Sequence, residues 1–305
     1  MTNKTVLITG GTGLIGKHLC RTLLDKGYRI HLLTRQLKPS TNERLKTFVW
    51  NVEKGQIDEE CIAGVETVIH LAGEGIVDKR WTKKRKQDII NSRTNSIRLI
   101  YDLIGKQASP SVKHIISAAA IGFYADRGDE LMTELSPAGE GFLAESCIAW
   151  EQAVDEGKEL GLRIVKFRTG IVLDTAGGAL AEIARPVKFG LGAALGSGKQ
   201  WVSWIHWKDV VKMYKFAMEN EKLEGIFNMV GPYPATNLEL TKAIAKQLNK
   251  PLWLPAVPAF VLKLAMGEMS AAVLGSTKTS AQKIMDAGFT FDFPELEPTL
   301  KDLYA

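Results

Sequence analysis

The 305-residue sequence predicts an α/β fold in which a doubly wound parallel sheet is joined to a smaller C-terminal lobe. Two observations predict the sheet. Short apolar runs alternate with segments of helical periodicity, and a glycine cluster separates the first apolar run from the first helical segment. A third observation predicts the lobe, because beyond Gly170 the alternation weakens and repeated glycines between residues 177 and 198 interrupt the chain.

Each strand is expected from a β-prone apolar run, and these runs lie at residues 4–9, 28–34, 48–50, 67–71, 114–117, 163–167 and 225–230. Helices are expected where apolar residues recur at helical spacing, at residues 14–24, 88–104, 141–160, 208–220, 236–249, 260–266 and 281–287. Residues 171–199 should form loops around one short helix. Because strands joined by helices need right-handed parallel crossovers, the helices should cover both faces of the sheet.

The composition is that of an ordinary globular protein, with 45% hydrophobic and 24% charged residues, enough to build a full core. The net charge of +5 arises from mixed charges along the chain, so it is only mild support for anionic ligands. Widely spaced cysteines indicate free thiols in a reducing compartment, and they are Cys20, Cys61 and Cys147. With only five scattered histidines, no metal site is expected.

No apolar run approaches the roughly 20 residues of a membrane span, and the first predicted strand leaves no room for a signal peptide. We therefore expect a soluble, cytoplasmic protein without a membrane partner. The basic run 79–86, which includes Trp81, could bind nucleic acid. No nucleic-acid module accompanies it, so we interpret it as the solvated start of a helix and expect no nucleic-acid partner.

The glycine cluster lies where a strand turns into a helix, and this context favours a phosphate-binding loop. Glycine allows a tight turn and close approach of the backbone, while the helix N-terminus attracts negative charge. A tight turn without a ligand is the alternative. The residues expected to contact a dinucleotide here are Gly10, Thr12, Gly13, Leu14, Ile15 and Gly16.

The end of the second strand carries Thr34 and Arg35, where an acidic residue would bind the ribose hydroxyls of NAD. A guanidinium at this position can grip a 2′-phosphate, so the sequence predicts NADP(H) as cofactor. The alternative for Arg35 is a solvated surface residue. Ligands of such sheets lie at the carboxyl ends of strands, so we also expect cofactor contacts from residues that close the next strands, namely Leu71, Ala72, Gly73 and Ser117.

By these features the chain resembles the extended short-chain dehydrogenase/reductase superfamily. More narrowly, it resembles an atypical group of NAD(P)-dependent epimerase/dehydratase-like proteins whose C-terminal domain has unknown function. The resemblance covers nearly the whole chain and rests on the glycine motif and on Arg80-Trp81-Thr82, Ser92-Arg93, Ser117-Ala118 with Tyr124, Trp150-Glu151, residues 168–173, Trp204-Ile205-His206, Asn228 and Gly288-Phe289.

The resemblance implies an NADP(H)-binding Rossmann domain and a substrate lobe assembled from the C-terminal part. We expect the Rossmann domain at residues 1–170, completed by 200–230, and the substrate lobe at 171–199 and 231–305. Homodimerisation through the two long helices beside the sheet is an expectation that comes from the family alone.

The chain departs from this superfamily in its acid/base groups. Superfamily enzymes usually pair a tyrosine with a lysine four residues on, which lowers the tyrosine pKa from about 10. None of the six tyrosines here has such a lysine, and residues 141–147 contain neither residue type. Weak substitutes are Tyr124, Glu145 and His206. For each, a structural role is favoured: an aromatic wall, a solvent-facing charge and a hydrogen-bonded core residue, respectively.

Two functions compete on this evidence. The leading one is an NADP(H)-dependent oxidoreductase or epimerase-like enzyme with nonstandard acid/base groups, acting on an unidentified small molecule. The alternative is a noncatalytic NADP(H)-binding module that senses redox state or scaffolds a partner. Fold analogy cannot separate them, because function resides in the site.

Overall fold

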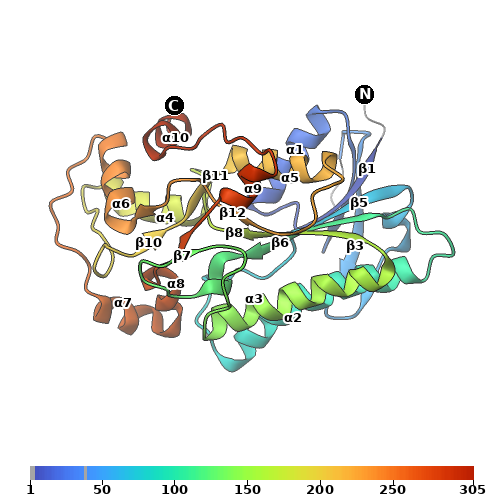
Figure 1. Ribbon diagram of the computed structural model, residues 1–305, viewed down its shortest axis with the longest axis horizontal. Coiled ribbons are helices and arrows are strands. Elements are labelled where there is room, and N and C mark those ends of the chain that lie inside the picture. The colour runs from blue at the N-terminus through green and yellow to red at the C-terminus, as the bar shows by residue number, and fades with distance from the viewer. Residues whose placement is uncertain (1–3, 38–39) are drawn as a thin grey trace.

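The computed structural model describes residues 4–37 and 40–305. Its main feature is an eight-stranded sheet in the order β12-β8-β6-β5-β1-β2-β3-β4 (Figure 1). All neighbouring strands pair in parallel except β4, which is antiparallel to β3. The strands are β1 (Thr5–Thr9), β2 (Arg29–Thr34), β3 (Leu45–Asn51), β4 (Gln56–Ile57), β5 (Val65–His70), β6 (His114–Ala120), β8 (Arg163–Thr169) and β12 (Gly225–Met229).

Helices cover both faces of this sheet, with α2 and α3 side by side on one face and α1 and α5 on the other (Figure 1). Each face has its own core: Val6 and Ile8 of β1 belong to the α1/α5 core, whereas Leu7 belongs to the α2/α3 core. This alternation is the period-2 pattern of a strand buried on both sides. The flanking helices are α1 (Leu14–Asp25), α2 (Lys83–Gly105), α3 (Phe142–Asp155), α5 (Trp207–Glu219) and α9 (Gln282–Asp286).

A smaller group of elements lies beside the carboxyl ends of the strands, at the left of Figure 1, and encloses a third core around Trp204. Its helices are α4 (Gly178–Lys188), α6 (Asn237–Gln247), α7 (Ala259–Met266), α8 (Ala271–Leu274) and α10 (Leu296–Leu303). Three two-stranded sheets complete the structure: β7 (Leu131–Met132) with β14 (Lys278–Thr279), β9 (Ile171–Leu173) with β11 (Trp204–His206), and β10 (Trp201–Val202) with β13 (Ala235–Thr236). Short 3₁₀ helices are η1 (Glu59–Ile62), η2 (Ile121–Tyr124), η3 (Glu156–Leu160) and η4 (Gly267–Ser270).

The α/β fold with a doubly wound parallel sheet is confirmed, and the structure corrects details of its elements. Helix α2 begins at Lys83 rather than 88, because the Thr82 side chain accepts a hydrogen bond from the Arg85 N–H and caps it. The helix expected at 141–160 changes to the 3₁₀ segment η3 after Asp155. The division into domains at the stated boundaries stays a prediction.

Among the described residues, no helix is both long enough and apolar enough to cross a membrane.

Candidate functional site

The turn from β1 into the start of α1 can be built only with glycine at two positions. Gly10 has φ of +66°, and a Cβ there would lie 2.8 Å from the Leu71 carbonyl carbon and oxygen. A Cβ at Gly16 would lie 2.3 Å from the Gly10 carbonyl oxygen. Helix α1 therefore packs directly on the loop, and the loop packs on the chain that leaves β5.

The opposite side of the loop is open. Thr12 and Gly13 are exposed, and a Cβ at Gly13 would lie 3.2 Å from the Gly10 oxygen. No side chain among the described residues caps the N-terminus of α1 at Gly13, and its first turn carries no acidic residue. First-turn N–H groups and the positive end of the helix dipole thus remain available to an anion. This cradle fits the pyrophosphate of a dinucleotide.

The end of β5 is positioned against this loop by a threonine. The Thr9 hydroxyl accepts hydrogen bonds from the N–H groups of Leu71 and Ala72, both at 3.0 Å. Gly73 follows and is exposed. The structure therefore brings together the glycine loop and the three residues that the sequence placed after this strand.

Arg35 follows β2, which pairs with β1, so it lies at the same edge of the sheet as the glycine loop. Its side chain is exposed. Glu74, on the loop after β5, carries a negative charge near this edge, and its pKa is lowered first by the Arg85 hydrogen bond and also by the positive charges of Arg35 and Lys79. A guanidinium in this place can reach an anionic ligand from solvent.

Ser117 lies deeper in the protein than these residues, and its contact with a cofactor stays a prediction. It lies in the middle of β6, is fully buried, and donates to the Ala118 carbonyl oxygen at 2.9 Å. Its oxygen is also 3.1 Å from Nδ1 of His70, whose Nε2 is 2.8 Å from the Ser96 hydroxyl. Its strand partner is His70, the last residue of β5, and three alanines continue β6 beyond it, so the buried side chain lies level with the end of β5 and contacts protein groups.

Tyr124, the first acid/base candidate, belongs to a buried polar network. Its hydroxyl donates to Oδ1 of Asn228 at 2.7 Å and accepts from Nη1 of Arg168 at 2.9 Å. Arg168 in turn forms a two-pronged ion pair with Glu151, at 2.7 and 2.9 Å. Burial raises the Tyr124 pKa, against the direction that general acid/base catalysis at neutral pH needs. These contacts favour a structural role.

His206, the second candidate, caps helix α5. Its Nδ1 accepts from the Lys208 N–H at 2.9 Å, Nε2 lies 3.1 Å from Asp302, and the ring stacks on Phe293 at 4.1 Å between centroids. The side chain is fully buried, and this burial lowers its pKa to about 4. The imidazole is therefore neutral at pH 7 and hydrogen-bonded at both nitrogens, as expected for a core histidine.

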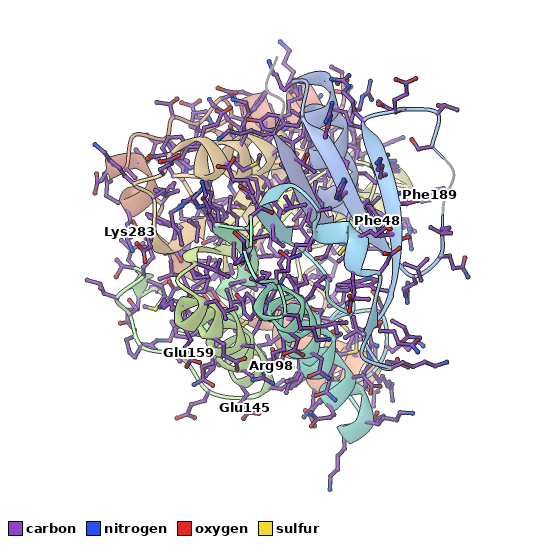
Figure 2. All side chains as sticks on the ribbon, turned by 90° about the vertical axis from the view of Figure 1, so that its right-hand side faces the viewer. Phe48, Arg98, Glu145, Glu159, Phe189 and Lys283 are labelled. Atoms are coloured by element: carbon purple, nitrogen blue, oxygen red, sulfur yellow. The ribbon has the colours of Figure 1, made fainter. Side chains whose placement is uncertain are left out.

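Glu145, the third candidate, is exposed in the first turn of α3 and labelled near the lower rim of Figure 2. This is the helix on which the tyrosine and lysine were expected, and its second turn carries Cys147. Burial raises the pKa of that thiol to about 12, so it is not a ready nucleophile. In the described part of the chain, no group of side chains could hold a metal ion.

Arg93, on α2, extends its side chain toward the end of β5, and the sequence motifs assign it no role. The Arg93 guanidinium packs against Gly73, donates to the carbonyl oxygens of Glu74 and Ile89 at 2.9 Å each, and lies 5.0 Å from the Trp150 ring centroid. The Ser92-Arg93 pair was visible as part of the resemblance. Its place could not be derived, because Gly73 and Trp150 are distant in sequence.

The comparisons with known proteins agree with this geometry. Residues 6–231 match the NAD dependent epimerase/dehydratase family, and residues 257–303 match a domain of unknown function, DUF1731. The epimerase family protein YfhF of Bacillus subtilis is 35% identical over 301 residues, which cover 98% of each chain.

Two solved structures extend the likeness. The human epimerase family protein SDR39U1, solved with NADPH, is 28% identical with a TM-score of 0.85, over 98% of this chain and 99% of that one. A nucleoside-diphosphate sugar epimerase from Corynebacterium glutamicum is 29% identical with a TM-score of 0.80, over 99% of this chain and 58% of that one. The resemblance inferred from the sequence motifs is confirmed, and the chain belongs to the NAD dependent epimerase/dehydratase family.

Proposed function

We propose that this protein binds NADP(H) on the glycine loop and uses it as an oxidoreductase or epimerase-like enzyme on a small molecule. The observation that carries the proposal is the glycine loop itself, closed by backbone on one side and open at Gly13 on the other. The presence of NADPH in the human relative's structure supports the choice of ligand.

The preference for NADP(H) over NAD(H) rests on Arg35. An exposed guanidinium next to the loop can form charge-assisted hydrogen bonds to a 2′-phosphate and stack on the adenine. The residue before it, Thr34, is buried and uses its hydroxyl to donate to the Gln36 carbonyl oxygen, at 2.6 Å. No carboxylate therefore stands at the end of β2 to bind the ribose hydroxyls in the manner typical of NAD.

When bound, the nicotinamide would supply a hydride acceptor or donor. The chain would contribute the binding and the electrostatics. Arg93, on α2, holds a positive charge between Gly73 and Trp150. Trp150 belongs to α3, the helix from which the family's lysine is missing. We infer that Arg93 supplies part of the positive field that the lysine provides in other members.

A second candidate, a noncatalytic NADP(H)-binding module, is favoured by a different observation. Two of the three acid/base candidates, Tyr124 and His206, are fully buried and hydrogen-bonded to protein groups. Such residues can hold the fold together without taking part in proton transfer. The module would bind the cofactor as tightly as an enzyme and turn nothing over.

Calorimetric titration of NADPH and NADH against the wild-type protein and Arg35→Ala tests the binding proposal. We expect micromolar or tighter NADPH binding that weakens by about 2 kcal/mol in the variant, with NADH binding unchanged. No binding of either dinucleotide to the wild-type protein would refute both candidate functions.

Turnover separates the two candidates. With binding established, the protein is given NADPH and a panel of carbonyl compounds, and in parallel nucleotide sugars, with cofactor oxidation and sugar interconversion as readouts. Reaction with at least one compound supports the enzyme. Uniform inactivity of a protein that binds NADPH tightly supports the module.

A further inference from the structure

Glu74 is an acidic side chain placed among cations at the edge of the proposed cofactor site. It follows Gly73, on the loop that leaves β5. Its carboxylate accepts a hydrogen bond from Nη1 of Arg85 at 2.8 Å. Arg35, on the far side of β1, is close enough for its charge to act on the same carboxylate. Glu74 is therefore an anion at the same edge of the sheet as Arg35, the residue proposed to bind the 2′-phosphate.

The backbone around Glu74 is held from helix α2, so the carboxylate has a defined place. The Glu74 N–H donates to the Ser92 hydroxyl at 3.0 Å, and its carbonyl oxygen accepts from Nη2 of Arg93 at 2.9 Å. Arg85 adds a third tie, because its Nη2 donates to the Gly75 carbonyl oxygen at 2.6 Å. Three side chains of α2 thus fix this loop.

Arg85 has binding capacity that these contacts do not use. Its side chain is 12% exposed, yet Nε is buried with no hydrogen-bond partner in the described part of the chain. The Glu74 carboxylate engages it through a single oxygen and a single nitrogen. A guanidinium can donate five hydrogen bonds in a planar fork, and an unpaired buried donor is costly. Arg85 is therefore a guanidinium whose potential is only partly satisfied by protein groups.

We propose that Arg85 is a second binding group, beside Arg35, for the 2′-phosphate of NADP(H), and that Glu74 is the carboxylate which this phosphate displaces. The inference rests on the proposed function. Parallel strands β5, β1 and β2 end at one edge of the sheet, so the residues that follow β5 and β2 flank the glycine loop from its two sides. A phosphate between them meets Arg35 from one side and the Glu74-Arg85 pair from the other.

Glu74 and Arg85 should have opposite effects on the affinity for NADP(H), which an ion pair with a merely structural role would not produce. Glu74 repels a phosphate placed near Arg35 and competes for Arg85, so it lowers the affinity for NADP(H). NAD(H) carries no 2′-phosphate and is indifferent to both residues. Removing the Glu74 carboxylate should therefore tighten the binding of NADP(H), and removing the Arg85 guanidinium should weaken it.

The experiment measures dissociation constants of NADPH and NADH for the wild-type protein, Glu74→Gln, Arg85→Gln and the control Lys84→Gln. Lys84 is exposed and adjacent on α2, so its variant loses the same charge outside the Glu74 contact. We expect Arg85→Gln to weaken NADPH about tenfold and Glu74→Gln to tighten it about threefold. NADH binding should change by less than about twofold in every variant, and Lys84→Gln should match the wild type.

Three outcomes would overturn the inference: equal effects of Arg85→Gln on both dinucleotides, no effect on either, or weaker NADPH binding by Glu74→Gln. Each would mean that the pair only holds the loop. If Arg85→Gln does not fold, Arg85→Lys replaces it, because a lysine keeps the charge and loses the fork, and a smaller selective loss of NADPH affinity is expected. Failure of the wild-type protein to bind NADPH would instead refute the proposed function.

Discussion

Gly13 and Gly16 show how one glycine motif serves two purposes at the scale of single residues. Gly16 is required by the fold, because backbone atoms of Gly10 and Gly11 occupy the space of a side chain. Gly13 has φ of −75°, which any residue can adopt, and a Cβ there would lie 3.2 Å from the Gly10 carbonyl oxygen, a contact that requires a shift of only a few tenths of an ångström. A side chain at Gly13 would meet far less of the protein than one at Gly16, and we therefore expect Gly13 to leave room for a ligand that comes close to the backbone.

This difference predicts opposite behaviour for two alanine variants. The free energy of unfolding of Gly13→Ala should lie within about 1 kcal/mol of the wild-type value, while its affinity for NADPH should fall at least about tenfold. Gly16→Ala should lose about 2–4 kcal/mol, because the loop or α1 must move. Denaturant unfolding and calorimetry measure the two quantities. Unchanged NADPH affinity in a folded Gly13→Ala protein would contradict the placement of the pyrophosphate.

At the scale of elements, a buried ion pair joins strand β8 to helix α3. Arg168 and Glu151 are 5% and 9% exposed, and the guanidinium also lies 3.4 Å from the Phe123 ring centroid. The same guanidinium bonds to Tyr124, and through it to Asn228 of β12. One cation thus ties together two strands of the sheet, a 3₁₀ helix and α3.

We expect Glu151→Gln to lower the free energy of unfolding by about 3 kcal/mol, because it leaves a buried guanidinium without its counter-charge. The matched control is Glu156→Gln, which breaks the exposed pair with Arg98, a residue of α2 that is labelled in Figure 2. That variant should cost less than about 1 kcal/mol. Urea unfolding compares them, and equal losses would show that the buried network carries no special share of the stability.

At the scale of the whole molecule, buried histidines make stability depend on pH. Burial lowers the pKa of His70 to about 3 and of His206 to about 4, and it lowers the pKa of His31 and His114 as well. The unfolded chain binds protons near pH 6.5, where the folded protein does not. A group whose folded pKa is lowered contributes stability that is present above its unfolded pKa and lost as the pH falls.

We therefore expect the free energy of unfolding to decrease as the pH falls from about 6.5 to 4.5. Each strongly shifted histidine contributes a slope of up to about 1.4 kcal/mol per pH unit. His206→Asn should flatten this slope, because it removes one titrating imidazole. The asparagine can still accept the Lys208 N–H at the start of α5, so the helix cap is kept. Urea midpoints across the pH range measure the slope. An unchanged slope in the variant would show that His206 is already protonated in the folded protein.

Most of the large elements could be predicted from the sequence, because strands and helices of five or more residues carry their own hydrophobic periodicity. The two- and three-residue strands β7, β9, β10, β11, β13 and β14 could not, because they are too short to show a period. Trp201, Trp204 and Trp207 follow neither strand nor helix spacing in the sequence, because they belong to β10, β11 and α5, three different elements.

By itself, the sequence determined the α/β class, the family and the glycine loop, because each depends on residues that are neighbours along the chain. Only the tertiary structure decided that Ser117 is buried beside His70, that Tyr124 bonds to Asn228 and that His206 reaches Asp302. Those contacts join residues that lie far apart in sequence, and burial and hydrogen bonding change what a side chain can do. The physical reason is that reactivity depends on surroundings, and surroundings are assembled by folding.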